Sequence, residues 1–281
     1  MAARVNPPFR ADHVGSLLRP PALHEARRRA QAGEITADDL REVEDASIRG
    51  VVALQEEIGL QGITDGEFRR TWWHFDFLSG FDGFELGPPL DAGTFKSSDE
   101  QPPTAKITAP LRRSRPVMVD HFTYLKGLTS RTPKFTVPGP SMAHFRAGRA
   151  GISEAVYPEL DAFWEDLTAA YRGELGELAA NGCRYLQVDD ISYAYLCDSD
   201  IRDNMRRRGD DPDALALTYA NALNAAIRDL PAEVTTAMHM CRGNFQSTWA
   251  ASGGYEPVAE RVFNTVTVDA LFMEYDSERA G

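Results

Sequence analysis

The 281-residue sequence predicts an α/β fold with a parallel sheet, because short apolar runs alternate with longer segments of helical periodicity. Six of these runs end in polar residues, and the chain contains no GxGxxG phosphate loop. An open doubly wound sheet usually has one phosphate loop and one ligand crevice, whereas a (β/α)8 barrel has functional residues at many strand ends. A (β/α)8 barrel is therefore the predicted fold, and the open sheet is the alternative.

The first 70 residues predict two strands and two helices. Residues 9–16 read as a short strand that ends in a loop, and helical periodicity follows over 21–32. The second helix, 36–58, opens with Thr-Ala-Asp-Asp, which is a capping-box signature. Residues 59–64 then read as a strand, and Asp-Gly-Glu67 stands at its end.

Residues 72–130 interrupt this alternation. They are rich in aromatic residues, Gly and Pro, and contain strand-like pieces at 106–109 and 116–119. We expect an excursion over the top of the domain that contains a hairpin.

The alternation resumes after residue 130. The predicted strands are 134–138, 184–188, 234–241 and 268–273, and the predicted helices are 153–180, 212–230 and 257–264. The polar residues at the six strand ends are Ser16, Glu67, Ser141, Asp189, Cys241 and Glu274. Because eight strands close such a barrel, we expect one domain over 1–281 that is truncated at its C-terminus and lacks the last two βα units.

A metal site is predicted at the end of the strand that closes with His239-Met240-Cys241. Side chains two apart on a strand point the same way, so the imidazole and the thiol leave the strand together. Nitrogen and thiolate sulfur are donors that Zn²⁺ prefers. A third donor, Glu274, ends the next strand, so the pattern indicates a catalytic zinc site. The alternative is a buried structural cysteine beside a structural histidine.

Composition excludes several classes of protein. The net charge of −12 argues against nucleic acid as a partner, since phosphate binding needs a basic surface. Three cysteines without a CxxC pair argue against a disulfide framework. No apolar run has the length of a signal peptide or a membrane span, so we expect a cytoplasmic protein. The sequence does not determine the oligomeric state.

Six stretches together carry a resemblance to a known family. They are Asp12-His-Val-Gly-Ser-Leu-Leu-Arg-Pro, Thr64-Asp-Gly-Glu-Phe, Val137-Pro-Gly-Pro-Ser, Leu186-Gln-Val-Asp-Asp, His239-Met-Cys and Phe272-Met-Glu-Tyr. In this order they resemble the C-terminal catalytic barrel of cobalamin-independent methionine synthase, and more closely its short single-domain relatives. The resemblance implies a (β/α)8 barrel whose zinc binds a substrate thiol and activates it for methyl transfer.

The resemblance also implies roles for individual residues. The implied zinc ligands are His239, Cys241 and Glu274; the family's fourth ligand, a second cysteine near the end of the last strand, has no match in this chain. Asp189, assisted by Glu67, is implied to hold the α-amino group of the substrate, and we expect these two acids to be catalytic. Ser16 and the backbone after Val14 match the segment that holds the substrate carboxylate.

The predicted function is zinc-dependent methyl transfer to a small thiol, with homocysteine as the expected acceptor and methyltetrahydrofolate or another methyl carrier as the donor. The family's donor-stacking tryptophan is replaced here by Met142-Ala-His-Phe-Arg after Ser141, which leaves the donor open. The alternatives are a thiol alkyltransferase of the epoxyalkane:coenzyme M type and an inactive truncated barrel. A zinc hydrolase with metal-bound water is a further option.

Overall fold

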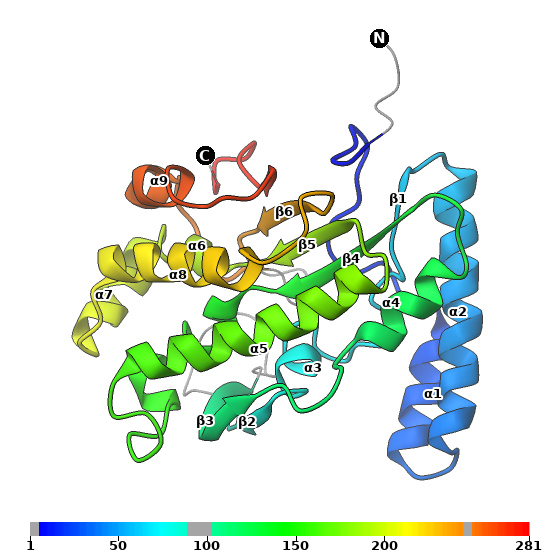
Figure 1. Ribbon diagram of the computed structural model, residues 1–281, viewed down its shortest axis with the longest axis horizontal. Coiled ribbons are helices and arrows are strands. Elements are labelled where there is room, and N and C mark those ends of the chain that lie inside the picture. Colours follow the sequence, from blue (N-terminus) through cyan, green and yellow to red (C-terminus); the bar gives the residue numbers. More distant parts are fainter. Residues whose placement is uncertain (1–5, 89–102, 244–248, 281) are drawn as a thin grey trace.

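The structure, a computed structural model, describes residues 6–88, 103–243 and 249–280. Within these residues lie a five-stranded parallel sheet in the spatial order β1-β4-β5-β6-β7 and a separate antiparallel hairpin, β2-β3 (Figure 1). The strands are β1 (Gly62–Ile63), β2 (Asp82–Gly87), β3 (Thr104–Arg112), β4 (Thr132–Pro138), β5 (Tyr185–Asp189), β6 (Thr235–Met240) and β7 (Ala270–Met273).

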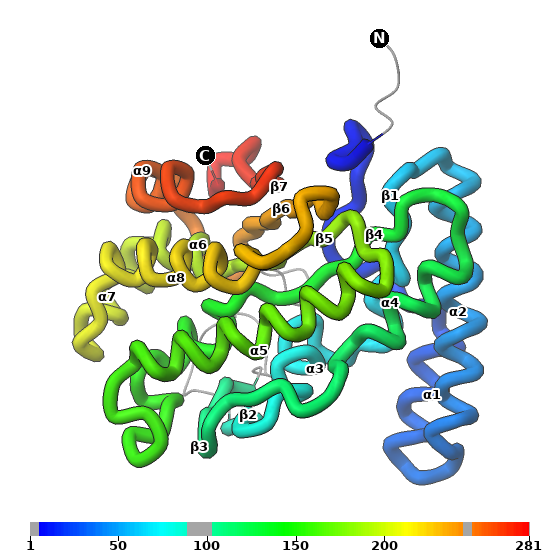
Figure 2. The backbone as a smooth tube through the Cα atoms, in the orientation of Figure 1, coloured from blue at the N-terminus to red at the C-terminus, as the bar shows by residue number. Residues whose placement is uncertain are grey.

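The helices cover one side of the sheet and one of its edges. They are α1 (Pro21–Gln31), α2 (Ala37–Glu57), α3 (Phe75–Leu78), α4 (Val119–Lys126), α5 (Leu160–Ala180), α6 (Ser192–Tyr195), α7 (Ser199–Arg207), α8 (Pro212–Ile227) and α9 (Glu256–Phe263), with short 3-10 turns at Pro140–Ala143 and Gly148–Gly151. Helices α5 and α8 lie side by side over the central strands, and α1 and α2 form a hairpin beside β1 (Figure 2). None of the helices in the described segments has the length and apolarity needed to cross a bilayer.

The central strands separate two environments because successive side chains point to opposite faces of a strand. The side chains that pack in the main core with the helices are Phe135, Val137, Leu186, Val188, Met238 and Met240. On the other face Tyr185, Ala237 and Phe272 form a small cluster with Phe9. The polar residues Thr136, Gln187, Asp189 and His239 alternate with the core residues and therefore share this second face.

Several predicted elements are confirmed. The parallel sheet, the first two helices and the hairpin in the 72–130 excursion are present. The capping box at the start of α2 forms as predicted: the amide of Asp39 donates to Thr36 Oγ1 at 3.1 Å, and the amide of Thr36 donates to Asp39 Oδ2 at 2.8 Å. Each bond satisfies a backbone amide at the start of the helix that has no carbonyl partner within the helix.

The predicted strand at 9–16 is wrong. This segment is irregular and crosses the polar face of the sheet, where its backbone bonds to side chains and loops instead of a neighbouring strand. Lys134 Nζ donates to the carbonyl of His13 at 2.7 Å, and the amide of Leu17 donates to the carbonyl of Gly66 at 3.2 Å. Gly15 has a φ of +77°, which an extended strand does not accommodate.

Three further predictions need correction. Residues 116–119 are not a strand but lead into α4, and α5 begins at Leu160 instead of residue 153. The described residues contain five parallel strands, not six, with β1 and β7 at the edges. The observed fold is thus an α/β fold with a curved, half-barrel sheet, and a closed eight-stranded barrel is not present among the described residues.

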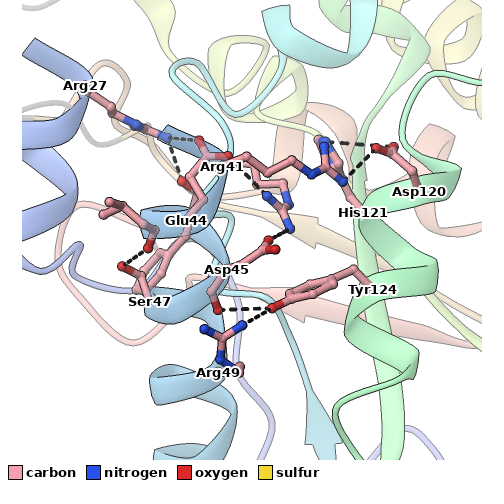
Figure 3. Close-up of polar contacts among 12 residues, drawn as sticks. Arg27, Arg41, Glu44, Asp45, Ser47, Arg49, Asp120, His121 and Tyr124 are labelled. Atoms are coloured by element: carbon pink, nitrogen blue, oxygen red, sulfur yellow. Dashed lines mark hydrogen bonds and ion pairs between the residues drawn. The ribbon is translucent and has the colours of Figure 1, made fainter. Parts of the chain in front are cut away.

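A polar network fastens the α1–α2 hairpin to the loop after β1. The buried Arg69 donates to Glu44 Oε2 at 3.1 Å and also binds Asp45, and its guanidinium lies 4.9 Å from the centroid of the Tyr124 ring. The Tyr124 hydroxyl donates to the carbonyl of Asp45 at 3.2 Å, which adds α4 to the network (Figure 3). Because Arg69 follows Glu67 by two residues, these contacts also fix the backbone that carries Glu67.

Candidate active site

The carboxyl ends of β4, β5 and β6 are tied together by backbone hydrogen bonds. The amide of Gly139 donates to the carbonyl of Asp189 at 2.8 Å, and the amide of Asp190 donates to the carbonyl of His239 at 2.9 Å. Asp189 and His239 are direct partners in the β5–β6 register. The sheet therefore delivers their side chains to one place, at the edge where parallel α/β proteins bind ligands.

Asp189 orients His239. Asp189 Oδ1 lies 2.9 Å from His239 Nδ1 and accepts a hydrogen bond of 2.6 Å from Gln187 Nε2. A carboxylate at Nδ1 keeps the proton on that nitrogen and leaves Nε2 as the basic atom. In many metalloproteins a carboxylate that does not itself bind the metal orients a histidine ligand in this way.

Asp190, the second acid of the pair, is structural. It is buried, and its carboxylate accepts hydrogen bonds from the Ser141 hydroxyl at 2.6 Å, the Ser192 hydroxyl at 2.5 Å and the Ser192 amide at 2.9 Å. These bonds join the first residue of α6 to the turn after β4. Gly139 faces the same carboxylate, and a Cβ there would lie 2.3 Å from Asp190 Oδ2. Only Asp189 of the two remains available to the site.

Glu67 has an unusual backbone and an unsatisfied side chain. Its φ of +58° is in the left-handed region, which residues other than glycine rarely adopt. Oε1 accepts a hydrogen bond from the Thr136 hydroxyl at 3.1 Å, whereas Oε2 is buried and has no partner among the residues that the structure describes. Burial raises the pKa of this carboxyl. Strain combined with an unpaired buried oxygen is typical of a ligand-binding position.

Cys241 follows His239 by two residues, just past the last residue of β6. Its sulfur accepts a hydrogen bond from the amide of Gly243 at 3.4 Å. Burial raises the pKa of the thiol to about 11, and the nearby Asp189 and Glu274 carboxylates act in the same direction. At neutral pH the group is therefore a thiol, and it would need a nearby cation to become a thiolate.

Glu274 follows β7 and is held by two arginines. Its Oε2 accepts a hydrogen bond of 3.0 Å from the amide of Arg242, and its Oε1 binds the guanidinium of Arg279. Partial burial alone would raise the pKa of Glu274, but these bonds lower it below its ordinary value. Over the residues that the structure describes, no three His, Cys, Asp or Glu side chains form a group able to hold a metal ion.

The segment expected to bind the substrate carboxylate lies beside the Glu67 loop. Val14 is 39% exposed, Ser16 is also exposed, and the next amide, that of Leu17, bonds to the carbonyl of Gly66. The structure thus brings this segment close to the turn before Glu67. Both residues are open to solvent on that side.

The donor chemistry of His239, Cys241 and Glu274 fits zinc. An imidazole with Nδ1 already occupied by Asp189, a thiol and a carboxylate are ligands that Zn²⁺ takes in proteins. The thiol lies within the electrostatic influence of Asp189 and Glu274, which would favour a cation between them. Glu274 is bound to Arg279 instead, so the three side chains match zinc in kind but are not assembled around one point.

Comparison with known proteins identifies the family. The family model described as "Cobalamin-independent synthase, Catalytic domain" matches residues 9–253. The chain belongs to the cobalamin-independent methionine synthase family. This confirms the resemblance that the six sequence stretches carry. The family is one of methyltransferases.

Two sequence relatives differ in their identity to this family member and in how much of their own length matches it. The uncharacterized protein YxjH of Bacillus subtilis is 42% identical over 275 residues, which cover 98% of this chain and 72% of that protein. The 5-methyltetrahydropteroyltriglutamate–homocysteine methyltransferase of Corynebacterium efficiens is 25% identical over 240 residues, covering 85% of this chain and 30% of the longer enzyme.

Solved structures agree with the fold. A putative vitamin-B12 independent methionine synthase from Listeria monocytogenes matches with a TM-score of 0.75 and 38% identity, over 95% of this chain and 73% of that one. A B12-independent methionine synthase from Shewanella sp. W3-18-1, solved in complex with selenomethionine, matches with a TM-score of 0.63 and 17% identity. The match covers 87% of this chain and 67% of that one. The second likeness supports the fold alone.

Several residues that support the site were not predicted. Gln187 donates a hydrogen bond to Asp189, and Thr136 donates one to Glu67. Gln187 and Thr136 occupy strand positions that face the polar side of the sheet. Each is a polar residue within an otherwise apolar strand, and this feature of the sequence could have indicated their role. Arg70 is also buried, and it donates to the carbonyls of Thr136 at 2.5 Å and Trp73 at 3.3 Å. It joins the Glu67 loop to β4.

Replacing Asp189 with asparagine tests its role in this cluster. An amide at this position can donate to Nδ1 of His239, which would move the ring proton to Nε2 and block that atom as a ligand. We expect zinc affinity to fall about 10- to 100-fold, measured by competition with a chromophoric chelator. The matched control is Asp198→Asn, an acid that caps α7 and bonds to Ser252. Equal zinc affinity in Asp189→Asn and the native protein would contradict the assignment.

Proposed function

We propose that this protein transfers a methyl group to the thiol of homocysteine with the help of a bound zinc ion. The observation that carries the proposal is the Asp189–His239 pair at the ends of β5 and β6, with Cys241 one alternate position further along. Family membership supports the reaction class, and the hydrogen bond from His239 to Asp189 supports His239 as a metal ligand. His239, Cys241 and Glu274 would hold the zinc.

Zinc at this position would bind the substrate sulfur and keep it as a thiolate at neutral pH. The protein's own groups then act on the rest of the substrate. Asp189 keeps the proton of His239 on Nδ1, and Glu67 presents a buried oxygen that has no partner within the described part of the chain. An ammonium group donates hydrogen bonds to such an oxygen and compensates its charge. We assign Glu67 and Asp189 to the α-amino group of the substrate.

The carboxylate of the amino acid is assigned to the segment of Val14 and Ser16. This segment is exposed and lies against the loop that carries Glu67, so a ligand bound to Glu67 could reach it. Gly15 in its left-handed conformation places consecutive amides in a turn, and such turns bind anions. The two ends of one amino acid would thus be bound by two neighbouring segments of the chain.

A second candidate is a thiol alkyltransferase that acts on a sulfonated thiol of the coenzyme M type. That substrate carries no ammonium group and would leave the buried Glu67 oxygen unpaired. Glu67 therefore favours homocysteine. For the donor, we propose a methyltetrahydrofolate-type compound, in line with the substrate named for the Corynebacterium efficiens relative.

Thermal denaturation of the zinc-loaded protein with each thiol tests the proposal. Homocysteine at about 100 times its Kd should stabilise the protein by about 3 kcal/mol, a rise in Tm of roughly 5–10 °C. The rise should be much smaller in Glu67→Gln, since an amide does not compensate an ammonium charge. A larger shift with coenzyme M would favour the second candidate. Zinc-loaded protein that responds to neither thiol would overturn the proposed function.

A further inference from the structure

The last described residues form a strap over Glu274. The amide of Gly253 donates to the carbonyl of Arg279 at 2.8 Å, and Arg242 Nη2 donates to the carbonyl of Ala280 at 2.8 Å. Ala280 is fully buried, as is Arg242, whose guanidinium lies 4.2 Å from the centroid of the Tyr255 ring. The backbone carbonyls of Arg279 and Ala280 are therefore both fixed to the fold.

The strap directs the Arg279 guanidinium to Glu274. Arg279 binds Glu274 Oε1, while Glu274 Oε2 accepts a hydrogen bond from the amide of Arg242. The same guanidinium lies 5.1 Å from the centroid of the Trp249 ring, which is a cation–π distance. Both oxygens of the carboxylate thus have partners, and one of these, Arg279, belongs to the strap that is held at two points.

The backbone around Glu274 is held independently of Arg279. The Tyr255 hydroxyl donates to the carbonyls of Met240 at 3.3 Å and Glu274 at 3.2 Å, and the amide of Glu274 donates to the carbonyl of Met240. These bonds tie the ends of β6 and β7 together. Loss of the Arg279 side chain would therefore free the carboxylate without moving the backbone that carries it.

We propose that Arg279 is a positioning residue that competes with the metal ion for the Glu274 carboxylate and so sets the metal affinity of the site. The inference rests on the proposed function, because it requires Glu274 to be a ligand. A cation can engage Glu274 only in the fraction of molecules in which Arg279 has left Oε1. The apparent Kd for the metal is the intrinsic Kd divided by that fraction.

Two consequences distinguish this role from a structural one. Removal of the guanidinium should tighten metal binding, whereas loss of a structural contact would weaken it or leave it unchanged. Metal binding should also release Arg279 from its place against Trp249. The indole is 54% exposed, so its fluorescence should respond when the guanidinium moves.

Zinc titration of Arg279→Ala, by chelator competition on the metal-free protein, is the test. Because the variant lacks a partly exposed, hydrogen-bonded ion pair, it should bind zinc roughly three- to tenfold tighter than the native chain. Arg279→Lys, which keeps the cation, should lie between the two. The matched control is Arg206→Ala, which removes an arginine paired with Asp203 on α7, and its zinc affinity should be unchanged.

Tryptophan fluorescence gives a second readout. Zinc should change the emission of the native protein, and the change should be lost in Arg279→Ala and in Trp249→Phe. Equal or weaker zinc binding by Arg279→Ala, with native circular dichroism, would overturn the role of Arg279 and leave the proposed function standing. Absence of zinc binding in the native chain and in Arg279→Ala alike would overturn both.

Discussion

Replacement of Cys241 with serine should reduce bound zinc from about one equivalent to nearly none, and should lower methyl transfer to homocysteine by more than about 100-fold. The hydroxyl of serine is a far poorer zinc donor than a thiolate, and the remaining protein donors would be one imidazole and one carboxylate. The carboxylate is already bound to Arg279. Metal analysis after gel filtration, together with a methionine-formation assay, measures both effects.

The control is Cys197→Ser, because Cys197 is buried near Arg242 but lies outside the β6–β7 edge. Zinc content should be unchanged in this variant even if its stability falls. His239→Ala should reproduce the loss seen for Cys241→Ser, since both side chains leave the same strand end. If Cys241→Ser retained a full equivalent of zinc, the metal assignment would be wrong and the thiol would be a buried structural group.

The sequence predicts the framework of the site well where local rules apply. Alternation along a strand places Gln187 and Asp189 on one face, and the parallel register places His239 beside Asp189. The capping signature at Thr36 is equally local and forms as predicted. The alternation and the cap depend on neighbours within a few residues, so one sequence suffices to predict them.

Features that depend on distant partners are not predicted. Residues 9–16 have the composition of a strand, but their position is set by the buried Lys134, which is more than 100 residues away in the sequence. Likewise, a Glu at a strand end reads as a metal ligand, but the sequence does not show that Arg279 binds it. Asp189 and Asp190 are neighbours of the same type, and their roles differ because Asp189 contacts His239 whereas Asp190 contacts Ser141 and Ser192.

Lys134 forms a buried ion pair with Asp12. Its side chain is fully buried on the polar face of the sheet, where Nζ donates to Asp12 Oδ1 at 2.8 Å and to the carbonyl of His13 at 2.7 Å. The ammonium also lies 4.9 Å and 4.7 Å from the ring centroids of Tyr185 and Phe272. Burial lowers the pKa of Lys134, and the charge of Asp12 opposes this effect.

Lys134→Met should destabilise the protein by about 3–5 kcal/mol, because it leaves the buried carboxylate of Asp12 without its cation. This corresponds to a fall in Tm of roughly 6–20 °C for a chain of this size, measured by thermal or urea denaturation. Asp12→Asn in the same chain should recover much of the loss, because the pair is then replaced by neutral groups. Additive losses in the double variant would show that the two side chains are not coupled.

The same substitution should also affect substrate binding in the molecules that remain folded. Lys134 fixes the carbonyl of His13, and Val14 and Ser16 follow directly. Without this bond the segment assigned to the substrate carboxylate would be ordered only on binding, which costs affinity. We therefore expect KM for homocysteine to rise while zinc content stays at one equivalent. Unchanged KM in folded Lys134→Met would place the carboxylate site elsewhere in the protein.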